Sequence, residues 1–371
     1  MTGIPFVDFK ARVSAVRGEV EAAVARVLDS GWFILGPECE AFERELAAAL
    51  GAADAVGVAN GTEAIQLALD AVGVGPGDEV VTSPMSAAFT GLAILAVGAR
   101  PVFADLDPST LNVSPDAVAR AITPRTKALL PVHLYGHPAD LDPLLEIARD
   151  RAVPLVEDAC QAHGARYKDK VVGALSGIGA LSFYPTKNLG ALGDGGAILV
   201  NDPARAARIR RARNGGQTDR YHHAEPGLNS RLDEIQAAIL RVGLRHLAAA
   251  NERRRTLASI YLRELASVDG LGLPREQPYA RSNWHLFVIR HPRRDALMAF
   301  LKERGVGTLI HYPVPLHLQG AFASRGGRPG DFPAAEKAAG EILSLPLYPE
   351  MSDAQALTVA AAVRDGAGRL S

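Results

Sequence analysis

The chain has 371 residues, of which 48% are hydrophobic and 22% charged, with a formal net charge of −1 at pH 7. This length suits two domains of roughly 100 to 200 residues each. The small net charge provides no basic field for nucleic acid or an anionic membrane, and the longest apolar runs, such as residues 92–97, are far below the ~20 residues of a membrane span.

The cysteines and the N-terminus indicate a compartment. Cys39 and Cys160 are too few for a disulfide framework, and residues 1–10 lack the charged and apolar regions of a signal peptide. We therefore expect a reduced, cytoplasmic protein. The Arg-rich run 205–213 is interpreted as a solvated helix face.

The first expected elements are two helices separated by a turn. Apolar spacing over residues 14–29 is typical of an amphipathic helix that Gly31 ends, and a second helix follows Pro37. Residues 31–36 form a glycine-bracketed aromatic turn, for which a buried hairpin corner is favoured over a lip above a pocket.

From residue 55 onward, β-prone runs alternate with helical patterns. The expected strands are 55–58, 79–82, 101–104, 128–131 and 154–156, and the expected helices are 62–72, 87–97, 115–122 and 141–151. This alternation implies right-handed βαβ units and an α/β fold with a mostly parallel sheet flanked by helices. Ligands of such sheets bind beyond the carboxyl ends of the strands.

The second half of the chain leads into a different composition. Expected strands at 180–183 and 197–200 are followed by a helix near 203–213, a polar segment, and a long helix from near residue 231. From about residue 247 we expect a smaller α+β unit, with an Arg-rich helix, a strand at 284–289, a helix at 296–304 and a Pro- and His-rich loop at 311–319. The predicted domains are therefore 1–246 and 247–371.

Lys187 lies in a Gly- and Pro-rich turn between the strands expected at 180–183 and 197–200. Most loop lysines are surface charges. Here, however, Ser182 lies five residues earlier, and glycines at 193, 195 and 196 leave room for a bulky group against the backbone. A lysine that forms a Schiff base needs such enclosure, because desolvation and nearby positive charge keep its amine neutral enough to attack a carbonyl.

Two further segments follow expected strands. Asn60-Gly61-Thr62 opens a helix, so it is either an anion site or an ordinary capping turn. Asp158 closes the strand at 154–156, with Gln161 in the turn beyond it. A carboxylate there suits the pyridinium nitrogen of pyridoxal phosphate, whose ring serves as an electron sink; the alternative for Asp158 is a helix cap.

The other reactive side chains near Asp158 have simpler interpretations. Packing is favoured for Cys160 and for His163. His133, His137 and His163 form no convincing liganding pattern with the two cysteines, so no metal site is predicted.

Taken in order, these segments resemble the fold type I pyridoxal-phosphate enzymes and, more narrowly, the DegT/DnrJ/EryC1/StrS family of nucleotide-sugar aminotransferases. The resemblance covers nearly the whole chain. Its matching segments are Pro5–Asp8, Gly31–Pro37, Asn60–Thr62, Asp158–Gln161, Ser182–Lys187, Gly227–Arg231, His311–Pro313 and Pro315–Gln319.

The resemblance implies a role for each matching residue. Lys187 would bind pyridoxal phosphate as a Schiff base and carry the proton of the transamination, Asp158 would pair with the pyridine nitrogen, and Gln161 with the phenolic oxygen. Gly61, Thr62 and Ser182 would hold the phosphate together with Asn229 of the neighbouring subunit. A homodimer with shared active sites follows. The residues near the substrate would be Tyr184, Arg231, His311 and Tyr312, and Trp32 to Gly36 would help to form the substrate mouth.

One segment departs from the family pattern. Many members carry an aromatic residue that stacks on the cofactor, whereas the aligned position here is Ala87, as in a subset of the family. The stacking residue is therefore unassigned, with Phe89 as a weak candidate.

The leading hypothesis is a transaminase that moves the amino group of glutamate to a keto group of a nucleotide-linked deoxyhexose. A dTDP-linked 3-keto-6-deoxyhexose is favoured over a 4-keto sugar by the segments 214–217, 221–223 and 311–317. A sugar dehydratase of the same fold would carry histidine at Lys187, and a non-catalytic regulator would tolerate loss of Lys187 or Asp158. A nicotinamide enzyme is disfavoured because no G-x-G-x-x-G follows the first strand.

Overall fold

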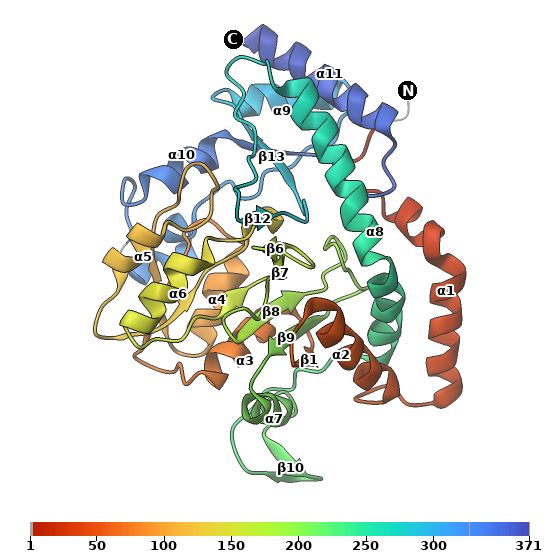
Figure 1. Ribbon diagram of the computed structural model, residues 1–371, viewed down its shortest axis with the longest axis vertical. Helices are drawn as coiled ribbons and strands as arrows, with labels where there is room; N and C mark the ends of the chain where they lie inside the picture. Colours follow the sequence, from red (N-terminus) through yellow and green to blue (C-terminus); the bar gives the residue numbers. More distant parts are fainter. Residues whose placement is uncertain (1–2, 326, 371) are drawn as a thin grey trace.

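The computed structural model describes residues 3–325 and 327–370, arranged around a central β-sheet (Figure 1). Its strand order is β1-β9-β8-β5 on one side and β3-β2-β4 on the other. Backbone bridges Leu129–Leu155 and Val132–Asp158 join the two parts between β5 and β4. The strands are β1 (Asp54–Val58), β2 (Glu79–Thr82), β3 (Arg100–Phe103), β4 (Thr126–Leu130), β5 (Glu157–Asp158), β8 (Ile178–Ser182) and β9 (Gly196–Val200).

The sheet is mostly parallel, as the alternation predicted. β9 is antiparallel to both of its neighbours, β1 and β8, whereas β8, β5, β4, β2 and β3 pair in parallel. The strand expected at 154–156 is displaced: β5 begins at Glu157, and Leu155 makes only the isolated bridge to Leu129. Because β1, β8, β5, β4, β2 and β3 run in one direction, their carboxyl ends share one edge of the sheet.

Helices cover both faces of this sheet because its strands bury side chains on both sides. Along β9, Ala197 and Leu199 belong to a core shared with α2, whereas Ile198 belongs to a core shared with α3 and α4. The helices of this part are α1 (Phe9–Ser30), α2 (Pro37–Leu50), α3 (Gly61–Ala71), α4 (Ala88–Ala96), α5 (Pro115–Ala121), α6 (Leu141–Asp150) and α7 (Pro203–Ala212).

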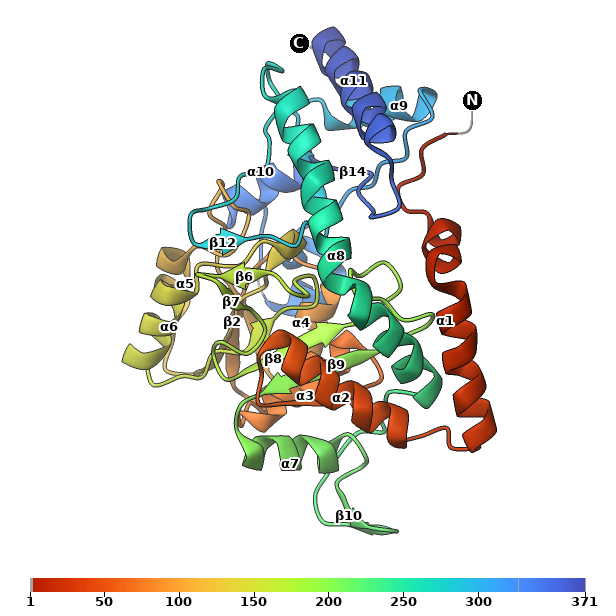
Figure 2. The same cartoon turned by 45° about the vertical axis from the view of Figure 1, so that its right-hand side comes forward.

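A single helix, α8 (Glu234–Leu265, 32 residues), connects the sheet to the rest of the chain. In Figures 1 and 2 it runs from beside α1 and α2 to α9 and α11 at the top of the molecule. The separate Arg-rich helix expected after residue 247 is wrong: α8 continues through it, because no glycine or proline interrupts residues 244–265. The domain boundary at 246/247 stays a prediction.

The C-terminal part has its own core. Tyr261 of α8 packs there with Phe287 and Leu297. Its elements are α9 (Arg294–Glu303), α10 (Pro333–Glu341), α11 (Asp353–Leu370) and the antiparallel pair β13 (Phe287–Arg290) and β14 (Ile342–Leu345).

Several short elements lack a sequence signal. They are the paired strands β6 (Arg166–Tyr167), β7 (Lys170–Val171) and β12 (Ala280–Arg281), the pair β10 (Gln217–Asp219) and β11 (His222–His223), and 3₁₀ turns at Leu134–Gly136, Leu316–Leu318 and Gly320–Arg325. β10 and β11 form a hairpin that projects beyond α7 (Figure 2). Within residues 3–325 and 327–370, no helix has the length and apolar character needed to cross a membrane.

Candidate active site

Lys187 lies in the loop between β8 and β9, where the sequence predicted it. Its backbone N–H donates to the carbonyl of Tyr184 at 2.8 Å and closes a turn. The side chain is partly buried. Burial lowers the pKa of the Lys187 amine, while the nearby Cys160 and Asp158 act in the opposite direction. A lysine with a lowered pKa has a larger neutral fraction, which is the nucleophilic form.

The helix α1 holds this lysine turn from outside. Arg12 donates from Nη1 to the carbonyl of Pro185 at 2.8 Å and from Nη2 to the carbonyl of Asn188 at 3.1 Å. These two carbonyls flank Lys187 in sequence. The planar fork of a guanidinium thereby fixes the backbone on both sides of the lysine.

Gly61 and Ser182 meet at the carboxyl ends of β1 and β8. A Cβ on Gly61 would lie 2.6 Å from Cβ of Ser182 and 3.2 Å from Sγ of Cys160, so only glycine fits there. Asn60 caps α3 by accepting from the N–H of Glu63 at 2.9 Å. Gly61 and Thr62 are the first two residues of α3, so their N–H groups have no intrahelical acceptor. The structure therefore has the capping turn, and the N–H groups of Gly61 and Thr62 remain candidates for an anion site.

Asp158 ends β5 at the same edge of the sheet and is buried. Its Oδ2 accepts from Oγ1 of Thr90 at 2.7 Å, and its Oδ1 accepts from the N–H of Cys160 at 3.2 Å. The second contact closes the turn that follows the strand. Because β5 pairs in parallel with β8, Asp158 and the loop after β8 that carries Lys187 lie at the same edge of the sheet.

Gln161 is oriented by two tyrosines. Its Oε1 accepts from the N–H of Tyr135 at 2.7 Å, and its Nε2 donates to the hydroxyl of Tyr312 at 3.1 Å. Tyr135 has φ 59°, a left-handed conformation that is uncommon for a non-glycine residue. The hydroxyl of Tyr135 also donates to the carbonyl of His311. These contacts bring Gln161, Tyr312 and His311 together.

The other residues expected near the substrate or the cofactor differ in how exposed they are. Nδ1 of His311 lies 2.9 Å from Oγ of Ser344, and burial lowers the pKa of His311 to about 4. Tyr184 has 54% of its surface exposed. Phe89, the weak candidate for stacking on the cofactor, is 60% exposed.

Asn229 and Arg231 lie outside this cluster. Asn229 is exposed and pairs through its backbone with Asn214, and Nη1 of Arg231 donates to Oδ1 of Asn214 at 3.0 Å. Between them, Oγ of Ser230 accepts from the N–H of Ala59 at 3.2 Å. The segment therefore approaches the turn before α3 through Ser230.

The turn at residues 31–36 is not the buried corner that the sequence favoured. Trp32, Phe33 and Ile34 are 57%, 48% and 39% exposed. Glu234 anchors the end of the turn, because its carboxylate accepts from the N–H groups of Gly36, Glu38 and Cys39 at 2.8 to 2.9 Å. A carboxylate at the N-terminus of α2 also interacts favourably with the dipole of that helix. The turn thereby presents these three apolar side chains outward.

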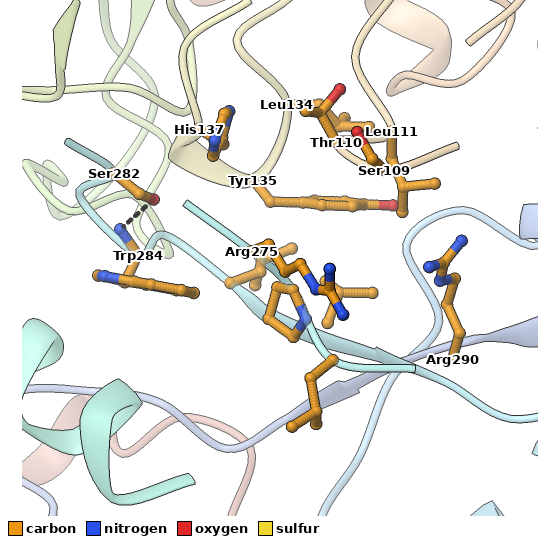
Figure 3. Close-up of a pocket in the computed structure, with 14 residues that line it drawn as sticks. Ser109, Thr110, Leu111, Leu134, Tyr135, His137, Arg275, Ser282, Trp284 and Arg290 are labelled. Atoms are coloured by element: carbon orange, nitrogen blue, oxygen red, sulfur yellow. Dashed lines mark hydrogen bonds between the residues drawn. The ribbon is translucent and has the colours of Figure 1, made fainter. Parts of the chain in front are cut away.

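A cavity lies beside the site rather than in it (Figure 3). Its volume of ≈ 40 Å³ has room for no more than a few water molecules. The ring of Tyr135 forms one wall, and Arg275 and Arg290 lie on the opposite side. Lys187, Asp158 and Ser182 do not line it. The cavity is too small for a cofactor or a sugar.

The residues present fit pyridoxal phosphate. The glycine at 61, the hydroxyl of Ser182 and the N-terminus of α3 form a cradle for a phosphate. A lysine of lowered pKa and a buried carboxylate lie at the same edge of the sheet. Sequence reasoning missed Arg12, Thr90 and Tyr135. Only Thr90 had a local signal, since it lies three residues after Ala87, in the segment that departs from the family pattern.

Comparison with known proteins gives a consistent set of relatives. The profile of the DegT/DnrJ/EryC1/StrS aminotransferase family matches residues 15–364. A dTDP-3-amino-3,4,6-trideoxy-alpha-D-glucose transaminase of Streptomyces venezuelae is 50% identical over 367 residues, which cover 99% of this chain and 97% of that protein.

Two solved structures extend the comparison. DesV of S. venezuelae, crystallised with a reaction intermediate, has a TM-score of 0.98 and 50% identity, with 100% of both chains covered. NtdA of Bacillus subtilis, with bound cofactor PMP, has a TM-score of 0.91 and 31% identity, with 100% of this chain and 85% of that chain covered.

Proposed function

Because this chain belongs to the DegT/DnrJ/EryC1/StrS aminotransferase family, we propose that it transfers the amino group of glutamate to the keto group of a dTDP-linked 3-keto-6-deoxyhexose. The chain is an aminotransferase, and pyridoxal phosphate is its cofactor. The observation that carries the proposal is the meeting of Lys187, Asp158, Gly61 and Ser182 at the carboxyl edge of one sheet.

Each residue of this edge has a distinct task in the proposal. Bound pyridoxal phosphate supplies an aldehyde that takes up the amino group and a ring that accepts electrons. Lys187 would attach the cofactor and would carry the proton of the transamination between the substrate carbon and the cofactor. Asp158 keeps the proton on the pyridine nitrogen. Gly61, Thr62 and Ser182 hold the phosphate, and Gln161 faces the phenolic oxygen.

The substrate side of the proposal uses residues from other elements. Tyr184, His311 and Tyr312 lie near the sugar, Arg231 adds positive charge to the substrate site, and Trp32 to Gly36 form part of the mouth. Burial lowers the pKa of His311 to about 4, so its imidazole is neutral near pH 7 and can hydrogen-bond a sugar hydroxyl without adding charge.

The proposal includes a homodimer in which the partner subunit's Asn229 completes each phosphate site. The exposed position of Asn229 supports this, since no acceptor in its own subunit occupies its side chain among the described contacts. The exposed Trp32, Phe33 and Ile34 supply apolar surface that an obligate interface would bury. Free thiols at Cys39 and Cys160 and a nucleotide-linked substrate fit a cytoplasmic enzyme.

The substrate class rests on the 50% identity to the dTDP-3-amino-3,4,6-trideoxy-alpha-D-glucose transaminase of S. venezuelae. The protein should be purified with pyridoxal phosphate and assayed with glutamate against dTDP-, UDP- and GDP-linked 3-keto and 4-keto sugars. We expect near-visible absorbance that borohydride bleaches, and fastest turnover with a dTDP-linked 3-keto sugar. Amination of 4-keto sugars alone would overturn the assignment of position, and absence of cofactor attachment would overturn the whole proposal.

A further inference from the structure

The lysine turn and the turn after β5 are joined by a buried group of amide side chains. Asn188 directly follows Lys187, and Asn251 comes from the middle of α8. Asn283 and His285 come from the segment before β13. Asn188, Asn283 and His285 are all buried. None of these four residues has a role in the proposed chemistry.

Asn251 bridges the two turns with one side chain. Its Nδ2 donates to the carbonyl of His163 at 2.9 Å, and its Oδ1 accepts from Nδ2 of Asn188 at 2.8 Å. His163 lies two residues after Gln161, and Asn188 one residue after Lys187. A single amide from α8 therefore fixes the separation between the turn of Lys187 and the turn of Asp158 and Gln161.

The orientation of both amides is determined by their neighbours. Asn188 also donates from Nδ2 to the backbone carbonyl of Asn283 at 3.0 Å, so its nitrogen must face that carbonyl. Its Oδ1 lies 3.1 Å from Nδ1 of His285, which must then carry a proton. Reversing either amide would place an oxygen against a carbonyl oxygen. The network has one consistent set of donors and acceptors.

Asn283 supports the same turn from a second direction. Its Nδ2 donates to the carbonyls of Gln161 and His163, each at 3.1 Å, and its Oδ1 accepts from the N–H of His285 at 3.0 Å. The backbone from Gln161 to His163 is thus held by two asparagines. Burial lowers the pKa of His285 well below its usual value, so this histidine is a neutral donor to Asn188.

We propose that Asn251 and Asn283 are positioning residues, which set the lysine turn against the cofactor turn through Asn188. This inference rests on the proposed function, because it assumes that the two turns hold opposite sides of pyridoxal phosphate. The cofactor attaches to Lys187 only when the amine and the bound aldehyde are correctly oriented. Small displacements of reacting groups lower such rates strongly.

The test uses Asn251→Asp in the full-length protein. The carboxylate still accepts from Asn188 but replaces the N–H that binds the carbonyl of His163 with an oxygen. Asn201→Asp is the matched control. Asn201 also bridges two loops, donating to the carbonyl of Ala174 and accepting from the N–H of Ala53, both at 2.9 Å, but it follows β9 at the end opposite to the lysine loop.

Apo-protein is mixed with pyridoxal phosphate, and the fraction attached to Lys187 is trapped with borohydride over time and measured by mass spectrometry; melting temperatures are measured alongside. We expect Asn251→Asp to attach the cofactor about tenfold more slowly than wild type, and Asn201→Asp to attach it at the wild-type rate. Equal rates for Asn251→Asp and wild type, or equal slowing in both variants, would overturn the inference.

Two further comparisons separate a failure of the proposed function from a failure of the positioning role. If wild-type protein attaches no cofactor, the proposed function fails, whereas normal attachment in wild type and in Asn251→Asp removes only the positioning role. If Asn251→Asp does not fold, Asn251→Ala is measured against Asn201→Ala, with the same expected difference in rate.

Discussion

The hydroxyl of Thr90 donates a 2.7 Å hydrogen bond to Oδ2 of Asp158 inside the protein. Thr90 has one hydroxyl proton, and Asp158 when ionised can only accept. Oγ of Ser86, which lies 2.7 Å from Oγ1 of Thr90, must therefore donate to Thr90. Two hydroxyl dipoles in series point toward this carboxylate. They hydrogen-bond and orient the carboxylate that the proposal pairs with a pyridinium nitrogen.

We expect Thr90→Val to slow transamination while Thr90→Ser has little effect. A hydrogen bond to a charged group contributes about 1.5 to 3 kcal/mol, so turnover should fall about 10- to 100-fold. Valine has nearly the volume of threonine but no hydroxyl, and serine keeps the donor. The check is kcat for the three proteins. Wild-type kcat in Thr90→Val would show that Asp158 does not need this donor.

Lys187→Ala should lose transamination by roughly three or more orders of magnitude, as removal of a covalent catalyst does. The fold should survive, because Lys187 is in a loop that Arg12 and Asn188 hold through other atoms. Kinetics, borohydride trapping and circular dichroism should be compared with Lys127→Ala, in which the lysine is exposed on β4. Turnover at the wild-type rate in Lys187→Ala would remove the residue from the mechanism.

Asp158→Asn should bind pyridoxal phosphate but transaminate at least about 100-fold more slowly, because an amide does not stabilise a protonated ring. The substitution keeps the side-chain volume and can still accept from Thr90. Cofactor affinity and the rate of the half-reaction with glutamate should be measured separately. Unchanged half-reaction kinetics would mean that the carboxylate serves another purpose.

The sequence predicted the helices and strands that are encoded by residues close together in the chain. The alternation from β1 to β5 and the hairpin that carries Lys187 follow from short apolar runs separated by helical patterns. Ser182 and Asp158 end strands and Gly61 follows one after two residues, so a shared edge of the sheet was sufficient to bring them together.

The residues that the sequence did not predict act over long separations. Asn251 reaches His163 across 88 positions and Thr90 reaches Asp158 across 68. Periodicity does not encode such pairs. One weak signal was available, since asparagine is a poor helix former and Asn251 lies inside a 32-residue helix. The sequence did not predict that α8 continues past residue 247, because the composition changes there whereas the backbone stays helical.

A buried carboxylate next to Asp158 gives a prediction about pH. Glu157 is fully buried, and its carboxylate accepts from the N–H groups of Ser176 and Gly173, both at 2.7 Å, and from Nε2 of His133 at 3.1 Å. Burial opposes ionisation, but these hydrogen bonds outweigh it and lower the pKa of Glu157. Nδ1 of His133 accepts from the N–H of Ala139 at 3.0 Å, so Nε2 carries the donated proton.

Because the pKa of Glu157 is lower in the folded state, its contribution to stability is present above the unfolded value of about 4.3 and is lost as the pH falls through the folded value. Glu157→Gln should lower the free energy of unfolding at pH 7 by about 2 to 4 kcal/mol, and its stability should change less between pH 5 and pH 3 (roughly the titration range). Urea denaturation across this range tests both. The exposed Glu21→Gln is the control, and an equal loss in both variants would contradict the role of Glu157.

The shared active site can be tested by mixing two inactive chains. Lys187→Ala and Asn229→Asp should each be weak alone, the second because a carboxylate repels a phosphate. In a mixed dimer, one site combines Lys187 from one chain with the partner subunit's Asn229, both intact. Random exchange of subunits should therefore restore about a quarter of wild-type activity.

The neighbouring Ser230 binds Ala59 within its own chain, so a phosphate contact from Asn229 in the same chain is the competing arrangement. That arrangement predicts no gain on mixing, because every site would then carry one of the two substitutions. Sedimentation of the wild-type protein completes the test, since a fully active monomer is incompatible with a site built from two chains.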